Sequence, residues 1–106
     1  MAEARHYATE YTVSLLPRDD PNGRNFNITV EYRGDDKWAI CWFRQCLSAT
    51  GEWDWESIPS ERTEEWLAAH RFDLDVALRL AKTAAPGVTC NGITAQAWVD
   101  RKKAQA

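Results

Sequence analysis

Apolar and polar residues alternate along much of the first half of the chain, which is the period of a half-buried β-strand. The alternation predicts strands over residues 11–16, 26–33 and 53–58, and a run that is apolar on both faces predicts a central strand over residues 38–43. The segments between them are rich in proline, glycine, aspartate and asparagine, which favour turns, and we expect residues 47–52 to form one of these turns. The pattern predicts an antiparallel meander of about four strands.

Beyond Pro59 the apolar spacing becomes helical. Ser60 is a suitable N-cap for a short first helix, and Asp73 for a longer one that ends at Pro86. Residues 88–90 have the character of a short extended segment, and Thr94 is placed to cap a last helix. Two or three helices are therefore expected after the strands.

The strands and helices are segregated along the chain, which indicates an α+β fold with the helix over 73–85 packed on one face of the sheet. We expect a single domain over residues 1–106, with residues 1–10 and 101–106 frayed. The predicted core consists of Val13, Leu15, Ile28, Val30, Ile40, Leu74, Leu78 and Ala81.

Composition narrows the possible classes of protein. The chain has 106 residues, of which 44% are hydrophobic and 27% charged, as in an ordinary globular domain. No apolar run is long enough for a membrane helix and the first residues lack a signal-peptide pattern, so we expect a cytoplasmic protein. Three cysteines without C-x-x-C spacing favour reduced thiols, and no cofactor or metal site is predicted.

Six tryptophans are unusual in a chain of this length, and two of them stand in Glu52-Trp53-Asp54-Trp55-Glu56. In a strand, both tryptophans would face one side and the three carboxylates the other. One interpretation is a core face opposite a solvated acidic face. The other is an acidic, aromatic-edged surface that docks a basic protein, because aromatic anchors carry much of the energy of interfaces.

Trp42 raises a related question, because Trp42 and its neighbour Phe43 would lie on opposite sides of one strand. One of these rings then needs a cover outside the main core. Either the C-terminal helices or a second copy of the chain, in a homodimer, could provide it.

Two other functions deserve weight. Sheet aromatics together with the basic tail Arg101, Lys102 and Lys103 could bind nucleic acid, although the formal charge of −3 opposes it and the tail also suits a helix C-terminus. An enzyme would need a partner for His70, which the sequence spacing does not supply. We therefore expect no catalytic residues.

Residues 51–59 and 71–81 resemble small uncharacterised proteins of actinobacteria and their phages, and the similarity runs from Tyr11 to Trp98. The resemblance implies an actinobacterial or phage origin and a cytosolic accessory role. It carries over no functional residues, because the group has no known activity. Taken with the residues themselves, it favours a noncatalytic protein-interaction module that binds its partner through the acidic tryptophan strand and Trp42.

Overall fold

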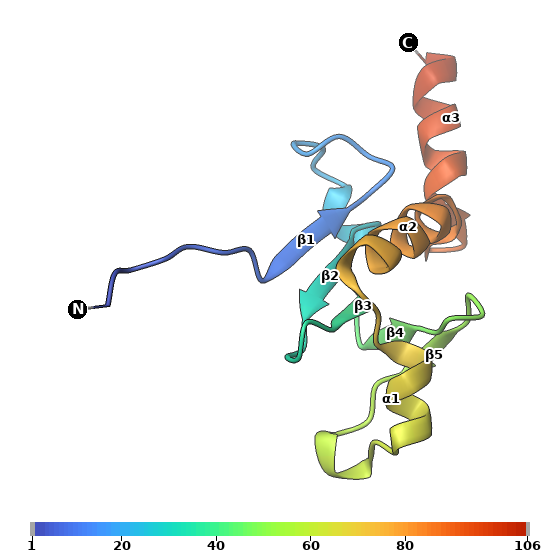
Figure 1. Cartoon of the computed structure of the whole chain (residues 1–106). Helices are drawn as coiled ribbons and strands as arrows, with labels where there is room; N and C mark the ends of the chain where they lie inside the picture. The colour runs from blue at the N-terminus through green and yellow to red at the C-terminus, as the bar shows by residue number, and fades with distance from the viewer. Residues whose placement is uncertain (1, 106) are drawn as a thin grey trace.

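The computed structural model describes residues 2–105 and contains one five-stranded antiparallel sheet (Figure 1). Its strands, in chain order and also in spatial order, are β1 Glu10–Val13, β2 Ile28–Tyr32, β3 Trp38–Trp42, β4 Gln45–Leu47 and β5 Trp53–Trp55. The predicted meander and the α+β class are confirmed. The sheet has one strand more than expected.

The extra strand, β4, lies between the predicted strand that ends at residue 43 and the predicted turn over residues 47–52, and it overlaps that turn at Leu47. It contains only three residues, too few for alternation to reveal it. A two-residue turn, Phe43-Arg44, reverses the chain directly after Trp42, so that Cys41 pairs with Cys46. The prediction that Leu47 belongs to a turn was therefore wrong, and the turn into β5 begins at Ser48.

The first strand also ends earlier than the alternation suggests. Ser14 accepts a hydrogen bond from the backbone N–H of Leu16 at 3.1 Å, a local turn that draws the chain out of the ladder after Val13. As a result Leu16, and not Leu15, is buried in the core.

Helix α2, Leu74–Ala84, covers one face of the sheet and contacts β1, β2 and β3 (Figure 1). The main core lies between them. Five of the predicted core residues, Val13, Ile28, Val30, Ile40 and Ala81, are buried there, whereas Leu15, Leu74 and Leu78 are half-buried around it. Leu47, Phe72 and Val88 belong to this core as well, although the sequence pattern did not reveal them.

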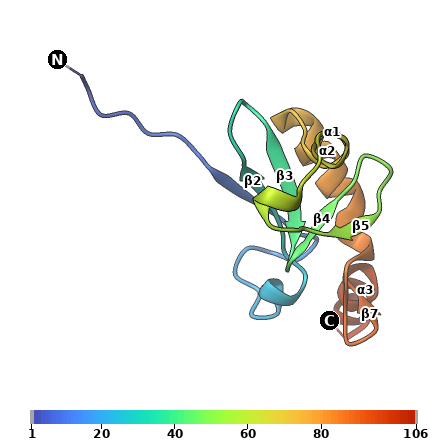
Figure 2. The same cartoon turned by 90° about the horizontal axis from the view of Figure 1, so that it is seen from below.

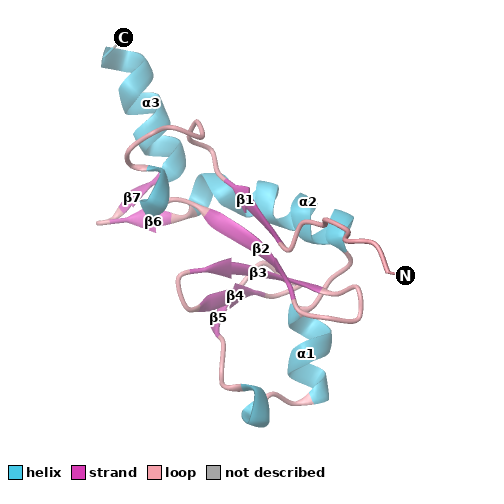
Figure 3. Ribbon diagram, turned by 90° about the vertical axis from the view of Figure 1, so that its left-hand side faces the viewer, coloured by secondary structure: helices cyan, strands magenta, loops and turns pink. Residues whose placement is uncertain are grey.

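Helix α1, Glu64–His70, lies against the other face (Figure 3). There Trp66 packs on Ala39, Cys41 and Cys46. The chain crosses from this face to the other at Phe72, whose backbone exchanges two hydrogen bonds with that of Trp38. The bridge uses the start of β3, which β4 does not reach because it pairs only with Cys41 and Trp42. The sheet is therefore covered by a different helix on each face.

The first helix does not begin at Ser60. Ser60 lies in a 3₁₀ turn, η2 Pro59–Glu61, and the N-cap of α1 is Thr63, whose hydroxyl accepts a hydrogen bond from the Trp66 N–H at 3.0 Å. Asp73 does stand at the N-cap position of α2, but its carboxylate binds Lys37 Nζ at 2.7 Å and makes no capping bond.

After α2 the chain forms a 3₁₀ turn, η3 Ala85–Gly87, a small hairpin of β6 Thr89–Cys90 and β7 Ile93–Thr94, and helix α3 Ala95–Gln105. Thr94 caps α3 as predicted, because its hydroxyl accepts from the Ala97 N–H at 3.0 Å. Helix α3 projects from the sheet (Figure 2) and includes residues 101–105, which were expected to fray; Ala106 lies outside the described residues. Lys102 on α3 binds Asp20 at 2.6 Å, in the loop that also holds the turn η1 Gly23–Asn25.

None of the helices within residues 2–105 combines the length and the apolar character needed to cross a membrane.

Candidate functional site

Strand β5 carries three of the six predicted contact residues, and it separates them by face. Trp53 lies opposite Leu47 and Trp55 opposite Gln45, whereas Asp54 lies opposite Cys46. Both tryptophans therefore belong to the face that α2 covers, and Asp54 to the face that α1 covers. The two tryptophans nevertheless differ in exposure. Trp53 is half-buried against the main core, and Trp55 is 64% exposed.

Strand β5 is also an edge of the sheet within the described residues. The Ser48 N–H donates to the Glu52 carbonyl at 2.8 Å, and the Glu56 N–H donates to the Arg44 carbonyl at 3.2 Å. Backbone groups alternate along a strand, so Glu52, Asp54 and Glu56 bond toward β4. The N–H and C=O groups of Trp53 and Trp55 consequently point away from the sheet, at an edge that can accept another strand.

An apolar surface patch surrounds Trp55. Phe43 is 72% exposed and Ile58 61% exposed, and both line, together with Trp55, one cavity of about 380 Å³. We call these three residues the Trp55 patch. Large apolar side chains that are exposed next to one another mark interaction sites more often than single ones do.

Phe43 reaches this position through an unfavourable backbone conformation. Its φ is +54°, in the left-handed region, and it is the first central residue of the β3–β4 turn. Glycine usually occupies such a position, because a bulky side chain there is strained. The ring packs edge-on against Trp42 with a centroid separation of 5.1 Å but remains largely exposed. The turn thus holds an aromatic ring at the surface beside the cavity, at a cost in backbone strain.

Asp54 is engaged with His70 on the opposite face. His70 Nε2 lies 2.7 Å from Asp54 Oδ2, and His70 Nδ1 lies 2.7 Å from the Trp66 carbonyl oxygen. The buried imidazole also stacks on the Trp66 indole, 4.1 Å between centroids. Both ring nitrogens are therefore engaged within the fold.

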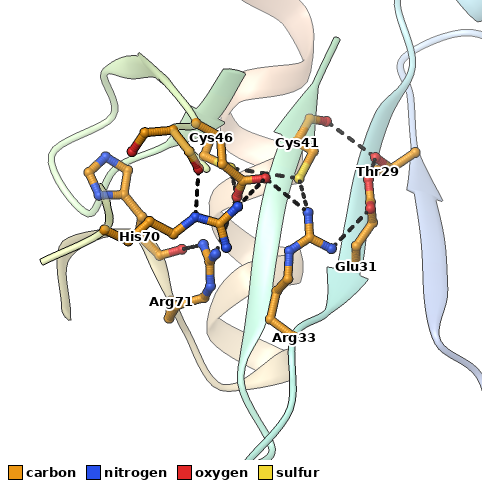
Figure 4. A network of polar contacts seen from close by, with 10 residues as sticks. Thr29, Glu31, Arg33, Cys41, Cys46, His70 and Arg71 are labelled. Carbon is orange, nitrogen blue, oxygen red and sulfur yellow. Dashed lines mark hydrogen bonds and ion pairs between the residues drawn. The ribbon is translucent and has the colours of Figure 1, made fainter. Parts of the chain in front are cut away.

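Glu56 is likewise turned inward, at the centre of an ionic network. Arg33 and Arg71, two members of this network, are labelled in Figure 4. Its two carboxylate oxygens lie 3.3 Å from Arg33, 3.5 Å from Arg62 and 3.2 Å from Arg71. Burial alone would raise the pKa of Glu56, but the hydrogen bond from Cys46 and the three guanidinium charges lower it below its ordinary value. The charge of Glu56 is therefore neutralised within the fold.

The predicted acidic surface is consequently reduced to two carboxylates. Glu52 is exposed, and the Asp54 side chain is partly exposed beside its contact with His70. Trp42 is half-buried and packs near Trp53, 5.8 Å between ring centroids. Its indole Nε1 is buried without a hydrogen-bond partner among the described residues.

In the basic tail, which was predicted as an alternative nucleic-acid site, Lys102 is engaged in an ion pair. Arg101, Lys102 and Lys103 are all exposed, and Lys102 alone of the three pairs with Asp20 and lies 5.9 Å from the centroid of the Trp98 ring. The tail lies on α3, and the Trp55 patch lies at the turn between β3 and β4.

Phe43 and Ile58 were not predicted as site residues. Phe43 was assigned to a strand and Ile58 to the end of another, where alternation places a residue on a face but does not show whether that face is covered. An apolar residue at a tight turn would have been the available signal. Within residues 2–105, no three His, Cys, Asp or Glu side chains are grouped so as to hold a metal ion.

Comparisons with protein-family models, with curated proteins and with solved structures found no match to this chain.

Proposed function

We propose that this protein is a noncatalytic protein-binding module, in which the edge of β5 accepts an extended segment of a partner and the Trp55 patch anchors it. The observation that carries the proposal is the 64% exposure of Trp55 on an edge strand. Strand addition of this kind draws affinity from main-chain hydrogen bonds and specificity from alternate side chains.

The side chains on either face of β5 define the chemistry of the partner. A strand added to β5 presents alternate residues to the two faces of the sheet. On one face these residues meet Trp53 and Trp55, which favours apolar side chains. On the other face they meet Asp54, with Glu52 on the same side, which favours lysine or arginine. The partner segment therefore alternates apolar and basic residues.

A second copy of the chain fits this edge poorly. In an antiparallel pair of two β5 strands centred on Asp54, the two Asp54 carboxylates oppose each other. Centring the pair on Trp53 sets Asp54 against Glu52 of the other copy, again acid against acid. Like charges directly opposite are destabilising, so charge favours a basic partner over self-association.

Fluorescence anisotropy with a labelled short peptide of alternating valine and lysine tests the proposal. We expect the peptide to bind the full chain and to lose most of its affinity for Trp55→Ala, since exposed aromatic anchors dominate such interfaces. Trp98→Phe, on α3, is the matched control and should bind as the unmodified chain does.

Two further peptides separate strand addition from simple charge attraction. A peptide of the same composition with all lysines at one end keeps the charge but loses the alternation, and a valine–glutamate peptide reverses the charge. Both should bind more weakly than the alternating valine–lysine peptide. Equal binding of the three peptides, or undiminished binding to Trp55→Ala, would overturn the proposal.

A further inference from the structure

Two cysteines face each other across neighbouring strands beneath helix α1. Cys41 on β3 and Cys46 on β4 are direct partners in the antiparallel register, and their Sγ atoms lie 3.8 Å apart (Figure 4). Both are buried, Cys41 at 6% and Cys46 at 1% exposure. The sequence spacing did not suggest this pair, because the four residues between the cysteines span a turn that alternation missed.

The backbone at this pair has the geometry of a cross-strand disulfide. The two-residue turn is closed by the hydrogen-bonded pair Trp42 and Gln45, so the next pair, Cys41 and Cys46, is the non-hydrogen-bonded kind. Such pairs have Cα atoms about 4.5 Å apart, within the range of about 4.4–6.8 Å that disulfides span. A bond between the two sulfurs therefore requires side-chain rotation and no rearrangement of the strands.

The surroundings of the two sulfurs differ. Cys41 Sγ lies 3.6 Å from Arg33 Nη2, and Cys41 lines the same cavity as the Trp55 patch. Cys46 Sγ is more deeply buried and donates its hydrogen to Glu56 Oε2 at 3.0 Å. The hydrogen bond with Cys41, then burial and the Glu56 carboxylate, raise the pKa of Cys46. Cys41 is thus the accessible sulfur and Cys46 the protected one.

We propose that Cys41 and Cys46 form a reversible dithiol–disulfide site that reacts by exchange with a small disulfide such as oxidised glutathione. The Cys41 thiolate attacks one glutathione sulfur, forms a mixed disulfide and releases the first glutathione, which takes up the proton that Cys41 lost. The Cys46 sulfur then attacks Cys41 Sγ, which breaks the bond between Cys41 and the second glutathione. The second glutathione leaves as a thiolate and takes up the proton that Cys46 loses.

This exchange conserves atoms and electrons: the two cysteines lose two electrons and two protons, and one glutathione disulfide becomes two glutathione thiols. It is independent of the strand-addition proposal, since it involves neither the outer edge of β5 nor a partner protein.

Peptide mapping of the full chain tests the site. The reduced protein is incubated with oxidised glutathione, its remaining thiols are alkylated, and trypsin digestion is followed by mass spectrometry without reduction. Cleavage after Lys37, Arg44 and Arg62 separates Cys41 on peptide 38–44 from Cys46 on peptide 45–62. We expect the two peptides to be joined by a disulfide, with Cys90 alkylated. Two unlinked peptides, or a link to Cys90, would overturn the proposal.

Single variants then assign the roles of the two sulfurs, with circular dichroism to show that each variant is folded. Cys46→Ser should stop at the first step and accumulate glutathione on Cys41. Cys41→Ser should leave Cys46 without glutathione, because the accessible sulfur is gone. Modification of Cys46 in Cys41→Ser at the rate seen for Cys41 in Cys46→Ser would contradict the assignment. The wild-type peptide map needs no variant, so a misfolded variant does not remove the test.

Discussion

The His70 imidazole is bonded to the Asp54 carboxylate at 2.7 Å, which ties the last turn of α1 to the edge strand β5. His70 is the buried end of this pair, and its other ring nitrogen is held by the Trp66 carbonyl. The contact therefore positions α1 over the smaller core of Ala39, Cys41 and Cys46. It also occupies one carboxylate oxygen of Asp54 on β5.

Removing the acceptor should destabilise the protein. We expect Asp54→Ala to lower the free energy of unfolding by about 1–3 kcal/mol, because His70 Nε2 is left buried without a partner. Asp54→Asn should lose less, since its amide can still bond the ring. Glu52→Ala, at an exposed acid on the same strand face, should change the free energy by no more than about 0.5 kcal/mol. Urea unfolding followed by tryptophan fluorescence measures all three, and equal losses for Asp54→Ala and Glu52→Ala would count against the tie.

The start of α1 gives a second stability test. Thr63 caps the helix through its hydroxyl, whereas Ser60 lies in the preceding 3₁₀ turn and makes no capping bond. Thr63→Ala should lower the free energy of unfolding by about 0.5–2 kcal/mol, the range for loss of a cap. Ser60→Ala should have little effect. Chemical denaturation distinguishes the two, and a larger loss for Ser60→Ala would place the cap at Ser60 after all.

The network around Glu56 predicts a dependence of stability on pH. The pKa of Glu56 is lower in the folded chain than its ordinary value of 4.5, so the unfolded chain binds more protons between the two values. The stability that Glu56 contributes is complete above about pH 4.5 and is lost as the pH falls through the folded-state pKa. Glu56→Gln should therefore be less stable near neutral pH, by about 1–3 kcal/mol, because three arginines lose the negative charge that they share.

The same variant should show a flatter loss of stability on acidification than the unmodified chain. Glu61→Gln, at an exposed acid in the turn η2, is the control and should keep the full pH dependence. Denaturant titrations at a series of pH values below neutral provide the comparison. Parallel curves for Glu56→Gln and the unmodified chain would contradict a lowered pKa at this carboxyl.

Phe43 has a strained backbone conformation and also belongs to the Trp55 patch. Phe43→Gly should relieve a left-handed conformation that costs on the order of 1–3 kcal/mol, and lose the contact with Trp42 worth about 0.5–1.5 kcal/mol. We expect a net gain of about 1 kcal/mol in the free energy of unfolding together with weaker binding of the valine–lysine peptide. Arg44→Gly should give no such gain, because the φ of Arg44 is not positive. A loss of stability in Phe43→Gly would show that the turn is not strained.

The sequence pattern predicted the sheet order because β2 alternates, with Ile28 and Val30 buried, and because β3 is apolar on both faces. It could not predict β4, since three residues are too few to show a period, nor the N-cap at Thr63, since Ser60 offers the same chemistry. The pattern could not predict that Trp53 and Trp55 differ in exposure, for another reason. Alternation puts Trp53 and Trp55 on one face, but only the placement of the core determines that Trp53 is covered and Trp55 is not.

The sequence pattern also could not predict which of the three acidic side chains form ion pairs. Glu52, Asp54 and Glu56 share one face, but the partners of Asp54 and Glu56 lie outside β5. They are His70, Arg33, Arg62 and Arg71. Pairing over such separations depends on where α1 docks, which local spacing does not encode. The pair Cys41 and Cys46 depended in the same way on a turn that the pattern did not show.

Amide hydrogen exchange of the full chain, with and without the valine–lysine peptide, tests the strand-addition proposal most directly. The backbone N–H groups of Trp53 and Trp55 face outward from the edge, whereas that of Asp54 bonds toward β4. The account predicts that the peptide slows exchange at Trp53 and Trp55 and leaves Asp54 unchanged. Protection that appears at β1 or on α3 instead, with Trp53 and Trp55 unaffected, would contradict it.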